Sequence, residues 1–126
     1  MKTILVIEDE KQYRDILAKK LENSGYTVMT AQNGQYALNI VKTSSIDLII
    51  LDLFMPVMDG LTFYYHLKNT LQKSIPVIIL TNLTETAYPS DVKDFIVKAN
   101  TSLDQVMEKI KKNLTEPTSS QTEKTS

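Results

Sequence analysis

Carboxylate side chains directly follow two apolar segments of this chain, and such groups bind cations or accept a transferred group. Asp52 comes after the run Leu48–Leu51, whose length and composition are typical of a strand buried on both faces. Glu8 and Asp9 follow a similar run at residues 4–7. Because ligands of open α/β sheets bind at the carboxyl ends of the strands, Asp52 is a candidate reactive group. Aspartate is also a common turn residue, so Asp52 alone leaves a structural role open.

Two further polar residues follow apolar runs later in the chain. Thr81 comes after residues 77–80, and Lys98 comes after residues 95–97. A hydroxyl and an ammonium group that face a carboxylate are suited to hold the oxygens of a phosphoryl group. Alone, each residue has an ordinary interpretation, a turn residue for Thr81 and a solvated side chain for Lys98. Together with the three carboxylates, they indicate a site for phosphoryl transfer.

The elements that position these residues follow from the alternation of short apolar runs with helical periodicity. Strands are expected at residues 4–7, 26–31, 48–51, 77–80 and 95–97. Buried central strands separated by helices favour a parallel sheet that is covered on both faces. The predicted fold is α/β, a doubly wound five-stranded parallel sheet in the flavodoxin-like order 2-1-3-4-5.

The predicted helices carry apolar faces that would cover this sheet. Residues at helical spacing in the first helix are Tyr13, Ile16, Leu17 and Leu21, and those of the third, which face mainly inward, are Leu61, Phe63, Tyr64, Leu67 and Leu71. Ser102 and Gln105 form a capping-box pattern at the start of the last helix.

The predicted strand order brings the three carboxylates into one cleft. The first and third strands are neighbours in this order, so Glu8, Asp9 and Asp52 meet where these strands end. Like charges a few ångströms apart repel and raise one another's pKa, whereas a hard divalent cation relieves the repulsion. Mg²⁺ is the expected cation, because carboxylates, waters and a phosphoryl oxygen suit its octahedral coordination.

Composition excludes several other classes of function. The chain has 126 residues, of which 42% are hydrophobic, and a net charge of -1, as expected for one domain with a single core. Without a basic stripe, nucleic-acid binding is not expected, and no apolar run approaches the ~20 residues of a membrane span. The chain lacks cysteine, which excludes disulfides and cysteine-ligated metals. A strand that starts near Met1 leaves no room for a signal peptide, so a cytoplasmic location is expected.

From Lys2 to about Leu114, the sequence resembles the receiver domain of two-component response regulators. The motifs that carry this resemblance are Ile7-Glu8-Asp9, Leu51-Asp52-Leu53-Phe54-Met55-Pro56, Met58-Asp59-Gly60, Leu80-Thr81 and Val97-Lys98. The resemblance implies a chemotaxis-regulator-like fold and phosphoryl transfer from a histidine kinase or a histidine phosphotransfer protein. It also implies a switch in contacts with a downstream protein target whose identity is unknown.

The resemblance assigns the acidic residues their roles. Asp52 would be the phospho-acceptor, Asp9 would bind Mg²⁺ directly, and Glu8 would bind it through water. The backbone carbonyl of Phe54 would supply a further ligand. The domain would catalyse only its own phosphorylation and dephosphorylation.

By the same resemblance, Thr81 and Lys98 would hold the phosphoryl group. Phe95 matches an aromatic switch position that turns inward when Thr81 moves toward the phosphate. An ordinary core aromatic is an equally good interpretation of the resting position of Phe95.

Two departures from the family pattern bear on this switch. Lys98 is followed by Ala99, where the family usually has a proline in a cis peptide, so we expect a trans bond here. Only 13 residues separate Thr81 from Phe95, near the minimum of about a dozen for a parallel crossover. We therefore expect a shortened or irregular fourth helix within residues 84–93.

These departures leave an alternative function open, that of a receiver-like binding scaffold that works without phosphorylation. Residues 1–114 are expected to form the receiver domain and residues 115–126 a disordered tail, because the tail is rich in Ser, Thr, Glu and Lys. The chain would then be either a single-domain regulator or a receiver whose effector domain lies beyond it. A flavin or nucleotide carrier is disfavoured, because Glu8-Asp9-Glu10 would repel phosphate.

Overall fold

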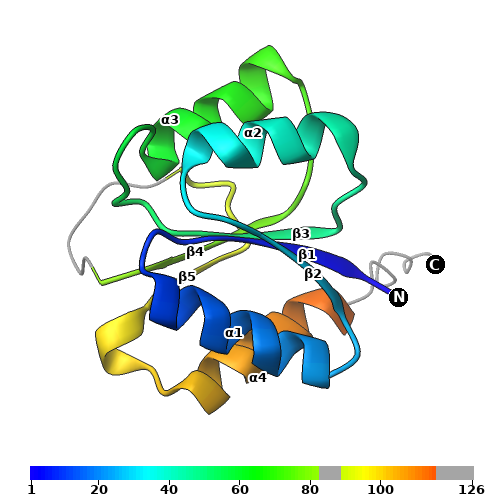
Figure 1. Cartoon of the computed structure of the whole chain (residues 1–126), viewed down its shortest axis with the longest axis vertical. Helices are drawn as coiled ribbons and strands as arrows, with labels where there is room; N and C mark the ends of the chain where they lie inside the picture. The colour runs from blue at the N-terminus through cyan, green and yellow to red at the C-terminus, as the bar shows by residue number, and fades with distance from the viewer. Residues whose placement is uncertain (83–88, 116–126) are drawn as a thin grey trace.

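The computed structural model describes residues 1–82 and 89–115. Within them, five parallel strands form one sheet in the order β2-β1-β3-β4-β5 (Figure 1). The strands are β1 Thr3–Ile7, β2 Thr27–Ala31, β3 Leu48–Leu51, β4 Val77–Thr81 and β5 Asp94–Val97. The predicted fold class and strand order are confirmed.

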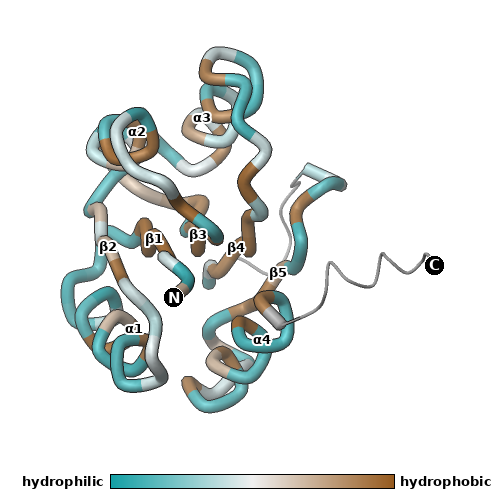
Figure 2. The backbone as a smooth tube through the Cα atoms, turned by 90° about the vertical axis from the view of Figure 1, so that its right-hand side faces the viewer, coloured by the Kyte–Doolittle hydropathy of each residue, from teal (hydrophilic) through white to brown (hydrophobic). Residues whose placement is uncertain are grey.

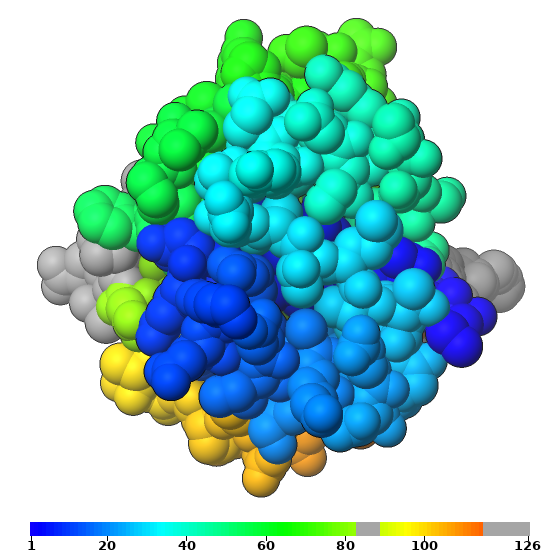
Figure 3. Space-filling view, in the orientation of Figure 1, coloured from blue at the N-terminus to red at the C-terminus, as the bar shows by residue number. Residues whose placement is uncertain are grey.

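Helices cover both faces of the sheet. The α-helices are α1 Lys11–Asn23, α2 Gly34–Thr43, α3 Gly60–Tyr65 and α4 Leu103–Thr115. A π-helical turn at His66–Thr70 continues α3, and a 3₁₀ turn at Lys98–Asn100 follows β5. Figure 1 shows α2 and α3 above the sheet and α1 and α4 below it. In the space-filling view of Figure 3, atoms of α2 and α3 fill the upper part of this face and atoms of α1 fill much of the lower part.

The core consists of two apolar clusters, one on each face of the sheet. Alternate residues of a strand point to opposite faces, so Leu5 and Ile7 of β1 pack toward α2 and α3, whereas Ile4 and Val6 pack toward α1 and α4. Accordingly, β3 is apolar along its whole length, and β4 is apolar up to its last residue, Thr81 (Figure 2). Burial on both faces is the reason that continuous apolar runs predicted these strands correctly.

The apolar faces of two helices differ in detail from the prediction. Ile16 of α1 is 47% exposed and Leu61 of α3 is 43% exposed, although both lie in the predicted apolar pattern. Leu17 of α1 is fully buried, and a position one residue away is rotated by about 100° around the helix. Ile16 therefore faces solvent although it follows the helical spacing, and Leu61 is an exception among the residues of α3 that face mainly inward.

The start of α4 confirms the predicted capping box. The backbone N–H of Gln105 donates to the Ser102 hydroxyl oxygen at 3.2 Å, and the backbone N–H of Ser102 donates to the Gln105 side-chain oxygen at 3.0 Å. These reciprocal bonds satisfy backbone donors that the first helical turn leaves free.

The connection from β4 to β5 is described only at its ends. Residue 82 and residues 89–93 form no helix, and residues 83–88, which hold most of the expected fourth helix, lie outside the described residues. The bond between Lys98 and Ala99 is trans, as expected. The expected tail at 115–126 also lies outside the described residues, apart from Thr115 at the end of α4. Within the described part, no helix is long and apolar enough to cross a membrane.

Candidate functional site

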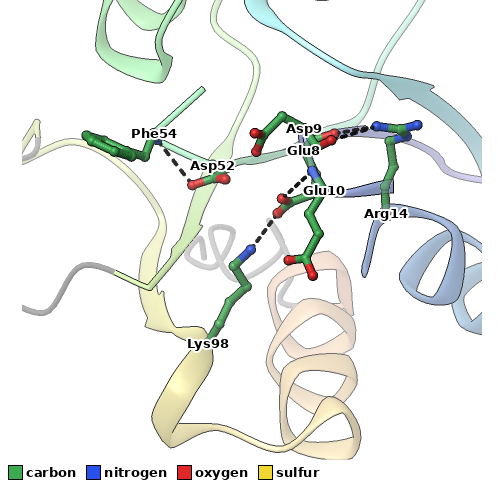
Figure 4. A network of polar contacts seen from close by, with 7 residues as sticks. All are labelled: Glu8, Asp9, Glu10, Arg14, Asp52, Phe54 and Lys98. Atoms are coloured by element: carbon green, nitrogen blue, oxygen red, sulfur yellow. Dashed lines mark hydrogen bonds and ion pairs between the residues drawn. The ribbon is translucent and has the colours of Figure 1, made fainter. Parts of the chain in front are cut away.

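The carboxyl ends of β1 and β3 place three carboxylates next to each other. Ile7 of β1 is paired with Leu51 of β3, so the residues that follow these strands are neighbours. Oxygens of Glu8, Asp9 and Asp52 lie within 4.8 Å of one another, and we call these three residues the acidic cluster (Figure 4). Glu8 and Asp52 are buried, whereas Asp9 is exposed to solvent.

Glu8 is held from two sides. Its Oε1 accepts a hydrogen bond from Lys98 Nζ at 2.7 Å, and its Oε2 accepts one from the backbone N–H of Glu10 at 3.0 Å (Figure 4). Only 7% of the Lys98 side chain and 4% of the Glu8 side chain are exposed, so this ion pair is shielded from water. Burial nevertheless raises the pKa of Glu8, and the bond to Lys98 opposes that rise.

Asp52 accepts hydrogen bonds from its own loop and from the end of β4. The backbone N–H of Phe54 donates to Asp52 Oδ1 at 3.2 Å, and the hydroxyl of the buried Thr81 also bonds to this carboxylate. Burial raises the pKa of Asp52, while these bonds and the charge of Lys98 oppose the rise. Asp52 therefore sits in a polar site where its negative charge is only partly compensated.

The six residues assigned to phosphate and metal binding line one cavity of about 240 Å³. They are Glu8, Asp9, Asp52, Phe54, Thr81 and Lys98, and they are joined by Glu10 and Asn82. Phe95, the predicted switch residue, does not line this cavity. It is half-buried in β5 and packs against the cluster on the α2 and α3 side of the sheet.

The acidic cluster fits a hard divalent cation by its donor chemistry. Its donors are carboxylate oxygens from three residues, two of which are buried with raised pKa values. A cation bound there would favour the charged carboxylates and offset the cost of burying them. Mg²⁺ matches this donor set, because it prefers oxygen ligands and retains waters.

Two residues at this site were not assigned a functional role from the sequence. The guanidinium of Arg14 donates to the backbone oxygen of Glu8 at 2.8 Å and so braces the turn after β1 (Figure 4). The Tyr13 ring lies beneath the Lys98 ammonium, with 4.4 Å between Nζ and the ring centroid. Tyr13 fits the apolar stripe of its helix, so its spacing alone indicates a core residue.

The loop after Asp52 is closely packed against the start of α3. The backbone N–H of Gly60 donates to the carbonyl oxygen of Leu53 at 3.0 Å, and Asp59 caps the helix by accepting from the N–H of Thr62 at 2.8 Å. A Cβ atom on Gly60 would lie 2.5 Å from the backbone oxygen of Asp52. The glycine thus allows α3 to begin directly behind the candidate acceptor.

Comparison with known sequences and structures agrees with this arrangement. The model of the response regulator receiver domain matches residues 4–111. A probable transcriptional regulator ycf27 from Cyanidium caldarium is 39% identical over 100 residues, which cover 75% of this chain and 39% of that protein. A second ycf27 protein, from Porphyridium aerugineum, is 38% identical, with 41% of its length covered. The chain thus spans about two fifths of the length of these curated relatives.

Solved structures with similar sequences share the fold. The response regulator TrrA from Thermotoga maritima, solved in complex with Mg²⁺-BeF, is 35% identical with a TM-score of 0.76, and the match covers 89% of this chain and 98% of that one. A two-component response regulator from Clostridium difficile is 25% identical with a TM-score of 0.81, over 90% of this chain and 96% of that one. By its sequence, its fold and the residues at the ends of its strands, the chain belongs to the response regulator receiver domain family, the signalling domains of two-component systems.

Proposed function

We propose that this receiver accepts a phosphoryl group on Asp52 and thereby switches its contacts with another protein. The donor would be the phosphohistidine of a histidine kinase or of a histidine phosphotransfer protein. The observation that carries the proposal is the single cavity in which Asp52 lies beside Thr81, Lys98 and the remaining carboxylates of the acidic cluster.

Residues of the cavity have complementary parts in the proposed reaction. A carboxylate oxygen of Asp52 forms a bond to phosphorus while the bond from phosphorus to the donor's histidine nitrogen breaks, and the nitrogen keeps the bonding electrons. The hydroxyl of Thr81 and the ammonium of Lys98 donate hydrogen bonds to the phosphoryl oxygens. The chain would catalyse this modification of itself and its reversal, without turning over a metabolite.

The metal of this proposal is Mg²⁺. Asp9 and Asp52 would bind it directly, Glu8 through a water molecule, and Phe54 through its backbone carbonyl. A bound Mg²⁺ would neutralise negative charge as the phosphoryl group meets the carboxylates. The complex of TrrA with Mg²⁺-BeF supports this choice of cation by similarity.

The new charge on Asp52 would be the signal. A phosphoryl group adds about two negative charges, which would draw Thr81 and Lys98 toward it, and Phe95 would respond by turning inward. We propose that this switch acts on a protein target, because the chain has no basic stripe that would suit nucleic acid or an anionic membrane. We further propose that this target lies in the cytoplasm. Residues 1–114 would form the receiver and 115–126 a tail.

The experiment that tests this function is the intact mass of the chain after incubation with acetyl phosphate. We expect a gain of one phosphoryl group when Mg²⁺ is present and little gain when EDTA removes divalent cations. A chain that gains no phosphoryl group under either condition would contradict the proposal. The alternative of a phosphorylation-independent binding scaffold would then be the better account.

A further inference from the structure

The Lys98 ammonium, which is shielded from solvent, has two partners of different character. It donates to the charged carboxylate of Glu8 at 2.7 Å, and it lies 4.4 Å from the centroid of the neutral Tyr13 ring. Tyr13 belongs to the first turn of α1, whereas Lys98 follows β5 at the other end of the chain. An ammonium group over the face of an aromatic ring is attracted by the ring's electron density, and more strongly when it is shielded from water.

The backbone at Lys98 is fixed from one side, because the preceding residue, Val97 of β5, is paired with Thr81 of β4. The 3₁₀ turn at Lys98–Asn100 contains no buried residue, and both Ala99 and Asn100 are exposed. The side chain of Lys98, in contrast, is 7% exposed. The strand fixes where the side chain begins, and the contacts with Glu8 and Tyr13 fix where its ammonium group lies.

These two contacts differ in what happens when the cavity is occupied. Glu8 belongs to the acidic cluster, so a cation bound there competes with Lys98 for the Glu8 carboxylate. The face of the Tyr13 ring carries no oxygen that could bind a cation in the acidic cluster. A divalent cation bound there would therefore leave the contact between the ring and the Lys98 ammonium in place. We propose that Tyr13 is a positioning residue for phosphoryl transfer, whose ring holds the Lys98 ammonium in place after Glu8 has turned to the metal.

Tyr13 is well placed for this role. It is half-buried and packs against the core cluster between the sheet and helices α1 and α4, so this packing fixes the position of the ring. Burial, together with the charges of Glu8 and Glu10, raises the pKa of Tyr13 to about 12. The phenol therefore stays neutral at the pH of the reaction, and the ring presents the same face to Lys98 throughout.

This inference rests on the proposed function, and a set of five variants tests it through the rate of phosphorylation by acetyl phosphate at saturating Mg²⁺. Tyr13→Leu should slow the reaction about fivefold, because it removes the ring face, while Tyr13→Phe keeps that face and should restore most of the rate. Tyr26→Leu is the matched control, since Tyr26 is also half-buried against the same core cluster but lies just before β2. It should not reproduce the loss.

The remaining two variants, Lys98→Met and its combination with Tyr13→Leu, separate positioning from a loss of packing. In a Lys98→Met background, Tyr13→Leu should cause no further slowing, because the ammonium on which it acts is gone. A further fivefold loss in that background would overturn the inference. So would equal rates for the wild type and Tyr13→Leu.

A second readout does not depend on phosphorylation. With ¹³C-labelled lysine, the ε-methylene signal of Lys98 should be shifted upfield by the Tyr13 ring in the wild type and in Tyr13→Phe, and the shift should vanish in Tyr13→Leu. The shift should persist when Mg²⁺ is added, and a shift that disappears with Mg²⁺ would overturn the inference.

If the wild type accepts no phosphoryl group, the proposed function fails and the positioning role fails with it. If the wild type is phosphorylated and Tyr13→Leu is equally fast, only the positioning role fails.

Discussion

Replacing Asp52 with asparagine is expected to abolish phosphorylation by acetyl phosphate while making the metal-free protein more stable. The amide keeps the shape of the side chain but is not a nucleophile toward phosphorus. It also removes a buried charge that lies within 4.8 Å of the carboxylates of Glu8 and Asp9. Neutralising such a charge should raise the free energy of unfolding by about 1 to 2 kcal/mol at pH 7 in EDTA.

The gain in stability should depend on pH. Because burial raises the pKa of Asp52, the folded protein binds the proton of this carboxyl more tightly than the unfolded chain does. The ionised Asp52 therefore weakens the fold near neutral pH, and protonation removes this penalty as the pH falls. Urea unfolding at pH 7 and at about pH 4 should show the advantage of Asp52→Asn shrinking at the lower pH.

A matched control for this variant is Glu22→Gln on the exposed surface of α1. It removes one negative charge without touching the acidic cluster and should change stability by less than about 0.5 kcal/mol. An Asp52→Asn protein that is less stable than the wild type in EDTA would contradict the account of a strained acidic cluster. One that still gains a phosphoryl group would contradict the assignment of Asp52.

Replacing Gly60 with alanine is expected to destabilise the protein by about 3 kcal/mol. The added Cβ would lie 2.5 Å from the backbone oxygen of Asp52 and 2.7 Å from the Cα of Leu53. Both are backbone atoms, so a change of rotamer cannot relieve the overlap. Either the start of α3 or the loop after β3 must move, and the bond from the Gly60 N–H to Leu53 would be lost.

Urea unfolding measures this effect against Thr62→Ala, an exposed position two residues further along the same helix. The control introduces the same side chain without the overlap, so its stability should stay within about 0.5 kcal/mol of the wild type. A loss for Gly60→Ala no larger than that of the control would show that this loop adjusts freely. The close contact between α3 and the acceptor would then have no structural importance.

Much of the site could be predicted from the sequence because its residues stand at the ends of buried strands. The apolar runs before Glu8, Asp52, Thr81 and Lys98 mark where the strands end, and parallel strands bring those ends to one edge of the sheet. The handedness of crossovers between parallel strands then restricts the strand order. For these residues, the apolar runs and the strand order both predict a position at the same edge of the sheet.

Contacts between side chains from different elements could not be read in this way. The sequence indicates that Lys98 faces the cavity. Its bond to Glu8 and the contact of its ammonium with the Tyr13 ring depend on how α1 approaches the turn after β5. Likewise, the helical pattern of α1 does not distinguish the exposed Ile16 from the half-buried Tyr13. The angle at which the helix lies on the sheet decides which of them meets the core.

The backbone conformation of the loop after β3 is a further feature that could not be predicted from the sequence. Val57 adopts a φ of 70°, a left-handed conformation that is unfavourable for a β-branched residue. Propensity alone would place glycine or asparagine there. The surrounding contacts, including the hydrogen bond from the Gly34 N–H to the Met58 oxygen, belong to the folded state and hold the loop in this shape.

The central claim is that the phosphoryl group resides on Asp52, and chemical mapping tests it most directly. An aspartyl phosphate is reduced by borohydride to homoserine, whereas a phosphorylated serine, threonine or tyrosine is not. After incubation with acetyl phosphate and Mg²⁺, reduction and digestion, peptide mass spectrometry should find homoserine at position 52, with Asp9 and Asp59 unchanged. Homoserine at another aspartate, or none at all in a chain that has gained a phosphoryl group, would contradict the account.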